Sequence, residues 1–316
     1  MAFRHTGLRH ATKHQGKIMT ENIQRLRTPS WLKRPIPRGD KVTRIRNVVH
    51  HWDSHTVCES AACPNRQECY SQGKLTFMIL GNICTRNCFF CKVKTGRPLP
   101  PDPDEPERLG KAAKELGLKY VVITSVCRDD LPDGGATQFA RVIDVLHHSL
   151  DIGVEVLIPD FRGSLSALEK VVAAQPTVLN HNVETVPRLY AEVRPQAEYQ
   201  RSLEVLKRAK SLDKGLLTKS GLMLGLGERE DEVIAVMQDL REAECDSITL
   251  GQYMRPSLEH HEVVRYVTHD EFAQYELIAR KMGFWGVAAG PLVRSSFNAA
   301  DLLNEVKLRR STNHPA

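Results

Sequence analysis

The sequence contains no continuous apolar run near the ~18 residues that a membrane-spanning helix needs. Its first residues also lack the apolar core of a secretory signal. No GxGxxG or GxxxxGK spacing accompanies the turn at Asp133-Gly134-Gly135, so this turn is a weak nucleotide motif. These absences exclude a helical membrane span and leave a phosphate-binding loop without support. With 41% hydrophobic and 26% charged residues, the 316-residue chain has the composition of a soluble globular protein.

Acidic residues are scarce in one region only, the amino-terminal end. Residues 1 to 46 contain twelve Lys or Arg and two acids, so this stretch carries +10 while the whole chain carries +6. The remaining residues therefore carry a net charge of −4. Without an excess of positive charge, this folded part is not expected to bind nucleic acid.

The basic start of the chain has three interpretations. Its first nineteen residues hold four Lys or Arg, three His and no acid. This composition fits a mitochondrial transit peptide, an upstream stretch before a start at Met19, or a disordered arm. We expect a cytoplasmic protein, with the mitochondrial matrix as the alternative, because clustered thiols indicate a reducing compartment.

Cysteine is concentrated in one short region. Six of the eight cysteines lie within 34 residues, in two groups with the spacings CxxxxCxxxxxC and CxxxCxxC. The first group is Cys58, Cys63 and Cys69, and the second is Cys84, Cys88 and Cys91. Soft thiolates in two compact triplets indicate two metal sites, either iron-sulfur clusters or zinc. The remaining two, Cys127 and Cys245, are expected to be buried bystanders.

Zinc and disulfides are the alternative explanations for these cysteines. A structural zinc site closes a tetrahedron with four ligands, and neither triplet supplies a local fourth thiol. His50, His51 and His55 lie just upstream and could complete one zinc site. A disulfide framework is less favoured, because such frameworks belong to small secreted domains and this chain is long enough to build a core.

The CxxxCxxC triplet has a more specific interpretation. Three cysteines can hold three irons of a 4Fe-4S cube and leave the fourth iron open to an external ligand. At this point the residues resemble the radical S-adenosylmethionine enzymes, including the aromatic pair Phe89-Phe90 before Cys91. The resemblance implies that the amino and carboxylate groups of the cofactor chelate the open iron. It also implies that electron transfer cleaves the cofactor to a 5′-deoxyadenosyl radical.

Within that superfamily the chain resembles the lipoyl synthases from about Pro29 to Ala299. Val57 to Asn65 with Cys69 is similar to the auxiliary-cluster segment of that family, and Phe77 to Cys88 is similar to its radical-cluster loop. Further similar stretches follow in family order: Thr124 to Leu131, Asn180 to Thr185, Lys219 to Gly225, Gly251 to Tyr253 and Arg294 to Ser296. The chain departs from the family at His260-His261-Glu262-Val263, where a His-Pro-Val stretch is usual.

The resemblance implies an enzyme that inserts sulfur at C6 and C8 of an octanoyl group carried on a lysine. The implied cofactors are two 4Fe-4S clusters and S-adenosylmethionine, with the auxiliary cluster consumed as the sulfur source. The implied partners are octanoylated lipoyl-carrier domains or a glycine-cleavage H-type protein, and an electron donor such as ferredoxin or flavodoxin. The alternatives are another radical enzyme with an auxiliary cluster, biotin-synthase-like or peptide-modifying, and a zinc-stapled binding module.

The auxiliary cluster needs a fourth ligand, because the first triplet offers only three thiolates. The family's terminal Arg-Ser-Ser-aromatic motif implies a serine oxygen, which places Ser296 on this cluster, with Ser295 as second choice. Oxygen is a poorer partner for iron than thiolate, which suits a cluster that is dismantled. Phe297 stands where the family commonly has tyrosine.

Six short apolar stretches, each followed by helical spacing, predict parallel strands joined by right-handed helical crossovers. The predicted strands are 75–80, 120–124, 154–158, 177–180, 221–224 and 247–250. Six units are too few for an eight-stranded barrel, and the resemblance favours a partial (βα)6 TIM-like barrel over a doubly wound sheet. The stretch that follows Pro37 through Cys69 is expected to be loop-like. The predicted divisions are a basic, partly disordered arm (1–47), an auxiliary-cluster segment (48–74), the partial barrel (75–282) and a C-terminal segment carrying the ligating serine (283–316).

Ligands of such folds sit at the carboxyl ends of the strands. Cys84, Asn182 and Glu184 each follow a predicted strand, so we expect them to share one end of the barrel. Asn182 and Glu184 have side chains that suit the ribose hydroxyls and amino group of the sulfonium cofactor. The segment Arg128-Asp129-Asp130 could form a solvated turn or line the mouth of the barrel and position substrate, and the family resemblance favours the second.

Overall fold

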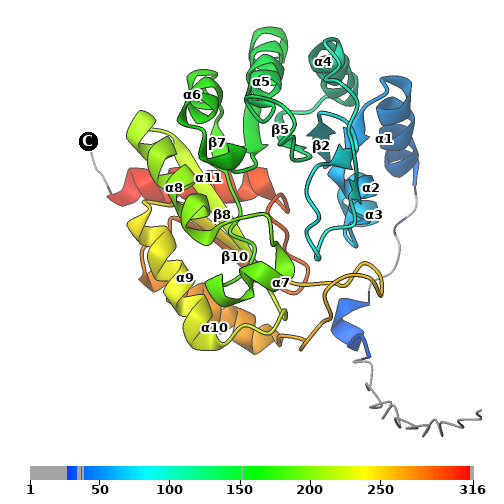
Figure 1. Ribbon diagram of the computed structural model, residues 1–316. Coiled ribbons are helices and arrows are strands. Elements are labelled where there is room, and N and C mark those ends of the chain that lie inside the picture. Colours follow the sequence, from blue (N-terminus) through cyan, green and yellow to red (C-terminus); the bar gives the residue numbers. More distant parts are fainter. Residues whose placement is uncertain (1–26, 34–36, 38, 151, 314–316) are drawn as a thin grey trace, which may run out of the picture.

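A computed structural model describes residues 27–33, 37, 39–150 and 152–313 (Figure 1). The basic first nineteen residues lie outside the described residues, and so does most of the arm predicted at 1–47. The described part of this arm holds a short 3-10 helix, η1 (Ser30–Leu32), and the start of helix α1 (Asp40–His51). Because α1 runs through residue 47, the division predicted there falls inside a helix.

One sheet of eight strands forms the centre of the fold. Its order is β1 (His55–Thr56), β2 (Thr76–Ile79), β5 (Tyr120–Ser125), β6 (Gly153–Leu157), β7 (Val178–Asn180), β8 (Leu217–Leu224), β9 (Ser247–Gln252) and β10 (Gly286–Gly290). Strand β1 is antiparallel to β2, and all the other neighbours are parallel. Among the described residues β1 and β10 do not pair with each other, so the sheet is an open, partial barrel.

All six predicted strands are confirmed, but the predicted count is one parallel strand too low. Strand β10 pairs in register with β9 over its whole length. Its sequence, Gly-Val-Ala-Ala-Gly, has little of the β-branched and aromatic character that marks a strand, and tertiary pairing rather than local propensity places it in the sheet.

The predicted helical spacings are confirmed by six helices that ring the sheet (Figure 1). They are α4 (Glu105–Leu116), α5 (Ala136–Leu150), α6 (Leu165–Ala173), α8 (Tyr199–Leu212), α9 (Glu230–Glu242) and α10 (His269–Lys281). Thr268 and Glu271 form a capping box that starts α10, and Gly117, in the left-handed region at φ 65°, ends α4. Among the described helices, none has the length and apolar character needed to cross a membrane.

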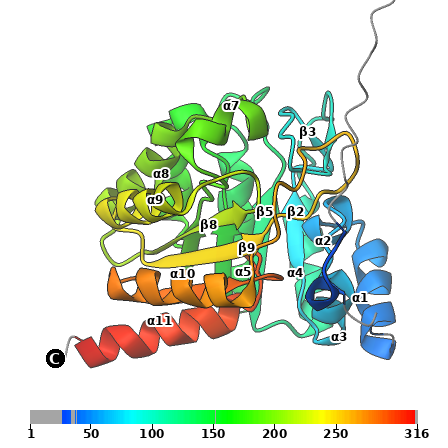
Figure 2. The ribbon, with the colours of Figure 1, turned by 90° about the horizontal axis from the view of Figure 1, so that it is seen from below.

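The two ends of the barrel differ. Helix α11 (Ala299–Asn313) lies against the amino-terminal end, where Leu303 and Val306 pack with Val178 and Leu217 of β7 and β8. An ion pair between Arg280 and Glu305 joins α11 to α10, and the two helices lie side by side in Figure 2. The loop that holds the CxxxCxxC triplet, marked by β3 (Ile83–Cys84), lies at the opposite end of the molecule (Figure 2).

The segment predicted to be loop-like through Cys69 is instead largely helical. It contains all of α1 together with α2 (Val57–Ser60) and most of α3 (Arg66–Ser71). The apolar side chains of α1 share one face and are buried: Val42, Ile45, Val48 and Val49. Thr56 caps α2 by accepting a hydrogen bond from the Glu59 amide. Core packing and caps, and not metal ligation alone, therefore order this segment.

Candidate active site

The CxxxCxxC triplet lies in the loop that follows β2 at the carboxyl end of the barrel. The amides of Arg86 and Cys127 donate to the Cys84 sulfur at 3.4 and 3.3 Å. The Cys127 thiol also hydrogen-bonds to Cys84 and lowers the pKa of Cys84 to about 6. Burial raises the pKa of Cys88 to about 11 and that of Cys91 to about 12, and both are raised further by neighbouring thiolates of the triplet. The three thiols therefore share one neighbourhood, as the spacing predicts.

Cys127 is not the bystander that the sequence suggested, because it contacts a predicted cluster ligand. Its carbonyl also accepts hydrogen bonds from the amide and hydroxyl of Thr85, at 3.1 and 3.0 Å. Cys245 does match the prediction of a buried thiol, and its sulfur donates to the Ser247 carbonyl at 3.3 Å.

The first triplet also comes together. Cys58 lies in α2, Cys69 in α3 and Cys63 between them. Burial raises the pKa of Cys58 to about 12 and that of Cys69 to about 11, and the charge of Cys63 raises both. Within the described part of the chain, no three His, Cys, Asp or Glu side chains are arranged to hold a single metal ion.

The C-terminal segment containing the two serines runs between the first triplet and the barrel mouth. The Asn65 amide side chain donates to the Leu292 carbonyl at 2.5 Å, which ties this segment to the loop after Cys63. Arg294 is half-buried, and desolvation of its guanidinium lowers its pKa, while the charges of Cys63 and Glu184 act in the opposite direction. Arg294 therefore lies within electrostatic reach of both the first triplet and the mouth.

Asn182 connects the C-terminal segment to the mouth. Its side-chain nitrogen donates to Ser295 Oγ and to Glu184 Oε1, both at 3.1 Å. Ser295, the second choice from the sequence, is thus the serine with a defined polar contact to the predicted cofactor residues. Ser296 is the next residue along the same segment and is half-buried.

Several buried polar atoms at the mouth have no hydrogen-bond partner within the part of the chain that the structure describes. They are Asn182 Oδ1, His181 Nε2 and Thr185 Oγ1. A side chain at Gly221 would place its Cβ 3.0 Å from Asn182 Oδ1 and 2.6 Å from Thr249 Oγ1, so glycine is what allows these two side chains to pack this close to the strand. Burial raises the pKa of Glu184. Orphaned buried acceptors and donors indicate a missing polar ligand, and these residues fit a cofactor with hydroxyl and amino groups.

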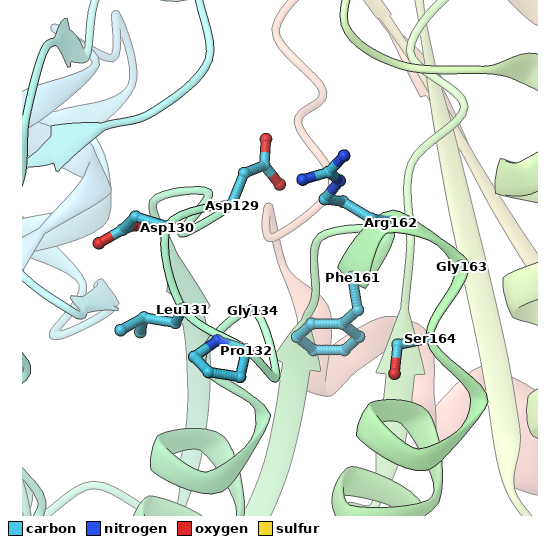
Figure 3. A pocket seen from close by; sticks show the side chains of 9 residues that line it. All are labelled: Asp129, Asp130, Leu131, Pro132, Gly134, Phe161, Arg162, Gly163 and Ser164. Carbon is cyan, nitrogen blue, oxygen red and sulfur yellow. The ribbon is translucent and has the colours of Figure 1, made fainter.

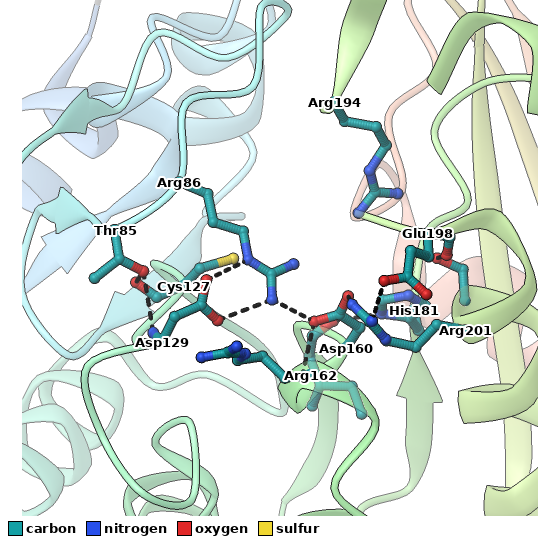
Figure 4. A network of polar contacts seen from close by, with 12 residues as sticks. Thr85, Arg86, Cys127, Asp129, Asp160, Arg162, His181, Arg194, Glu198 and Arg201 are labelled. Carbon is teal, nitrogen blue, oxygen red and sulfur yellow. Dashed lines mark hydrogen bonds and ion pairs between the residues drawn. The ribbon is translucent and has the colours of Figure 1, made fainter. Parts of the chain in front are cut away.

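A buried arginine network, which sequence reasoning missed, fixes the loop of the CxxxCxxC triplet to the barrel (Figure 4). Arg86 Nε binds Asp129 at 2.6 Å and its Nη2 binds Asp160 at 2.6 Å. Burial would raise the pKa of Asp160, but Arg86 holds it far below the ordinary value. Arg201 contacts the other oxygen of Asp160 at 3.4 Å. The carboxylate after β5 and the one after β6 thus clamp the same guanidinium.

The loop between β9 and α10 braces the same cysteine loop from the other side. His260 Nε2 lies 3.0 Å from the Cys91 carbonyl, and its Nδ1 lies 2.8 Å from Ser257 Oγ. The amide of His261 donates to the Phe89 carbonyl at 2.8 Å. The stretch that departs from the family pattern is therefore in direct contact with the loop of the CxxxCxxC triplet.

A pocket of about 450 Å³ opens beside this network, at the rim formed by the loops after β5 and β6 (Figure 3). Its lining comprises Asp129, Asp130, Leu131, Pro132, Gly134, Phe161, Arg162, Gly163 and Ser164. Asp129 and Asp130 line the rim of the mouth, as the sequence predicts. The neighbouring Arg128 is instead buried, and its guanidinium holds Asp130 through two hydrogen bonds of 2.9 and 2.8 Å.

Two family models match the chain. The radical SAM superfamily matches residues 78–240, and the N-terminal domain of lipoyl synthase of the radical SAM family matches residues 5–63. The second match begins before Pro29, so the similarity extends further toward the amino terminus than the motifs alone indicated.

Curated relatives match over most of the chain. A lipoyl synthase of Caldanaerobacter subterraneus is 56% identical over 87% of this chain and 96% of its own length. A lipoyl synthase of Aquifex aeolicus is 54% identical over 86% of this chain and 99% of its own length. Among solved structures, HydG, a maturase of the FeFe-hydrogenase, aligns with a TM-score of 0.53 and 16% identity, covering 86% of this chain and 61% of the maturase. The structural likeness bears on the fold alone.

Proposed function

The chain belongs to the lipoyl synthase family of the radical S-adenosylmethionine superfamily, and from this premise we propose that its two cysteine triplets hold two 4Fe-4S clusters. The enzyme inserts two sulfur atoms, at C6 and C8 of a protein-bound octanoyl group. A 4Fe-4S cluster and S-adenosylmethionine follow from membership of the superfamily. The family match decides against the biotin-synthase-like, peptide-modifying and zinc-module alternatives.

Cys84, Cys88 and Cys91 hold the radical cluster in this proposal, and Asn182 and Glu184 contact the cofactor. The proposal is supported by the shared neighbourhood of the three thiols and by the buried Asn182 acceptor at the mouth, which has no hydrogen-bond partner among the described residues. When bound, the cluster and cofactor supply an electron and a carbon radical able to break an unactivated C–H bond. The chain's part is to orient these groups and exclude water, because a radical reacts with whatever lies nearest.

Cys58, Cys63, Cys69 and Ser296 hold the auxiliary cluster. The observation that carries this assignment is the path of the C-terminal segment, which passes from Asn65 to Asn182 and so joins the first triplet to the mouth. When bound, this cluster would supply the sulfur, so its ligands and the residues at the mouth must be held at a fixed separation. A single segment shared by both sites meets that need, because it fixes their separation.

The partners and the compartment are part of the same proposal. An octanoylated lipoyl-carrier domain or a glycine-cleavage H-type protein presents the acyl chain at the mouth. A ferredoxin or flavodoxin supplies the electron. The enzyme acts in the cytoplasm.

An anaerobic iron and sulfide assay tests the two-cluster assignment. Full reconstitution is expected to give about eight irons and eight sulfides per chain, because each cubane holds four of each. The spectrum is expected to show broad absorption near about 400 nm and a brown colour. Four irons or fewer, with zinc present, would remove the second cluster.

Replacing the two serines separates their roles. Ser296→Ala is expected to leave cofactor cleavage near normal and to lower lipoyl formation by about tenfold or more, as loss of a metal-site group typically does. Ser295→Ala is the matched control, and it is expected to raise the KM for the cofactor, because Ser295 contacts Asn182. The product of cofactor cleavage and the lipoyl product are both measured in one single-turnover reaction. Wild-type lipoyl formation by Ser296→Ala would take Ser296 out of the mechanism.

A further inference from the structure

The rim pocket of about 450 Å³ takes no part in binding the clusters or the cofactor in the proposal above. It nevertheless adjoins the residues that hold the radical-cluster loop. Asp129 belongs to both, since it lines the pocket and binds Arg86. Figure 3 shows Asp129 and Arg162 extending toward the same side of the pocket, with Phe161 and Pro132 beneath them. A group seated here would therefore lie directly beside the support of the radical-cluster loop.

The charges lining the pocket are not equally satisfied. Both carboxylates are already engaged by buried arginines: Asp129 by Arg86 at 2.6 and 2.8 Å, and Asp130 by Arg128 at 2.9 and 2.8 Å. The guanidinium of Arg162 is exposed and has no carboxylate partner among the described residues. The available charge in the pocket is thus positive, and it suits a carboxylate.

The backbone holds Arg162 in this position at a cost. Phe161, Arg162 and Gly163 are consecutive left-handed residues, with φ of 45°, 53° and 79°. Residues with side chains adopt this conformation only where surrounding contacts hold them in it. Asp160 holds the turn, because its carboxylate accepts from the Arg162 amide at 3.0 Å and its carbonyl accepts from the Gly163 amide at 2.8 Å. The carboxylate that anchors the turn is also the one that clamps Arg86.

Resting on the proposed function, we propose that this pocket binds an acidic side chain of the carrier protein close to its octanoylated lysine. The carboxylate pairs with Arg162, and its methylene stem lies over the apolar surface of Leu131, Pro132 and Phe161. Binding there draws the carrier's acyl-lysine toward the barrel mouth. Asp160 and Asp129 connect the pocket to Arg86. The position of a carboxylate bound in the pocket is therefore fixed relative to the cysteine loop.

Two short octanoyl-lysine peptides test this, identical except for Glu or Gln beside the modified lysine. Wild-type enzyme is expected to show a KM about five- to tenfold lower for the Glu peptide, the effect of one partly exposed charge-assisted hydrogen bond. Arg162→Gln is expected to remove that preference without changing cofactor cleavage or iron content. Arg162→Lys is expected to keep part of the preference. The positive charge remains, but the planar guanidinium that can donate two hydrogen bonds to one carboxylate is lost.

Arg229→Gln is the matched control, since Arg229 is an exposed arginine that pairs with Asp231 and lies outside the pocket. Binding of fluorescent versions of the two peptides gives a readout that does not depend on turnover. Equal binding of both peptides by wild type, or an unchanged preference in Arg162→Gln, overturns the proposal. Failure of wild type to form lipoyl product from peptide or octanoylated carrier would instead overturn the proposed function, and the binding measurement tells the two failures apart.

Discussion

Cys84→Ala is expected to abolish cleavage of S-adenosylmethionine, whereas Cys58→Ala is expected to keep cleavage and lose lipoyl formation. The first change removes one of the three thiolates that leave an iron open for the cofactor. It also removes the sulfur that accepts from the Arg86 and Cys127 amides. The second change removes a ligand of the cluster proposed to supply sulfur and leaves the mouth untouched. Two activities that are coupled in the wild type should therefore separate.

Chromatographic assay of 5′-deoxyadenosine and of lipoylated peptide in the same anaerobic reaction measures both effects. We expect 5′-deoxyadenosine to fall to the level without enzyme in Cys84→Ala and to persist in Cys58→Ala. Cys245→Ala serves as the control, because that thiol is buried away from both triplets and should retain both products. Loss of sulfur insertion alone in both cysteine variants would contradict the division of roles.

The parts of this molecule that follow local rules were predictable from the sequence. Apolar stretches and helical spacing identified six strands and six helices, because both patterns reflect which face of an element is buried. Cys84, Asn182 and Glu184 could be assigned to one end of the barrel, because parallel strands bring their carboxyl ends together. The stretch from residue 38 through Cys69 was predicted to be a loop, although α1 carries an apolar stripe there. The prediction assumed that its cysteines, as metal ligands, would order the stretch.

The arginine network could not be predicted, because no local pattern records a long-range ion pair. Arg86 and Asp160 are 74 positions apart, and only the fold brings them to 2.6 Å. In the sequence, Cys127 likewise resembles a lone buried thiol. Its contact with Cys84 arises because β5 and β2 are neighbours in the sheet. The positive φ of Arg162 has no local signal either, since Phe and Arg avoid this region unless tertiary contacts hold them there.

Breaking a second buried ion pair is expected to have the largest effect on stability. This pair lies near the amino-terminal end of the barrel, which helix α11 covers. Lys219 of β8 lies 2.8 Å from Glu155 of β6, and their side chains are 2% and 1% exposed. Glu155 also accepts from the Tyr120 hydroxyl at 3.0 Å. Helix α11 covers this site through Leu302 and Val306, so water has little access.

Lys219→Met is expected to lower the free energy of unfolding by about 3–5 kcal/mol, because it leaves the Glu155 carboxylate buried without a counter-charge. Urea unfolding of the reconstituted protein, followed by far-ultraviolet circular dichroism, measures the change. The double variant Lys219→Met/Glu155→Gln should recover most of the loss, since the amide carries no charge and still accepts from Tyr120.

Lys214→Met provides the exposed comparison. Lys214 pairs with Glu244 at 3.1 Å with both side chains more than half exposed, so its loss should cost under about 1 kcal/mol. Equal losses from Lys219→Met and Lys214→Met would mean that the buried pair is screened as effectively as a surface pair, and that the amino-terminal end of the barrel is wet.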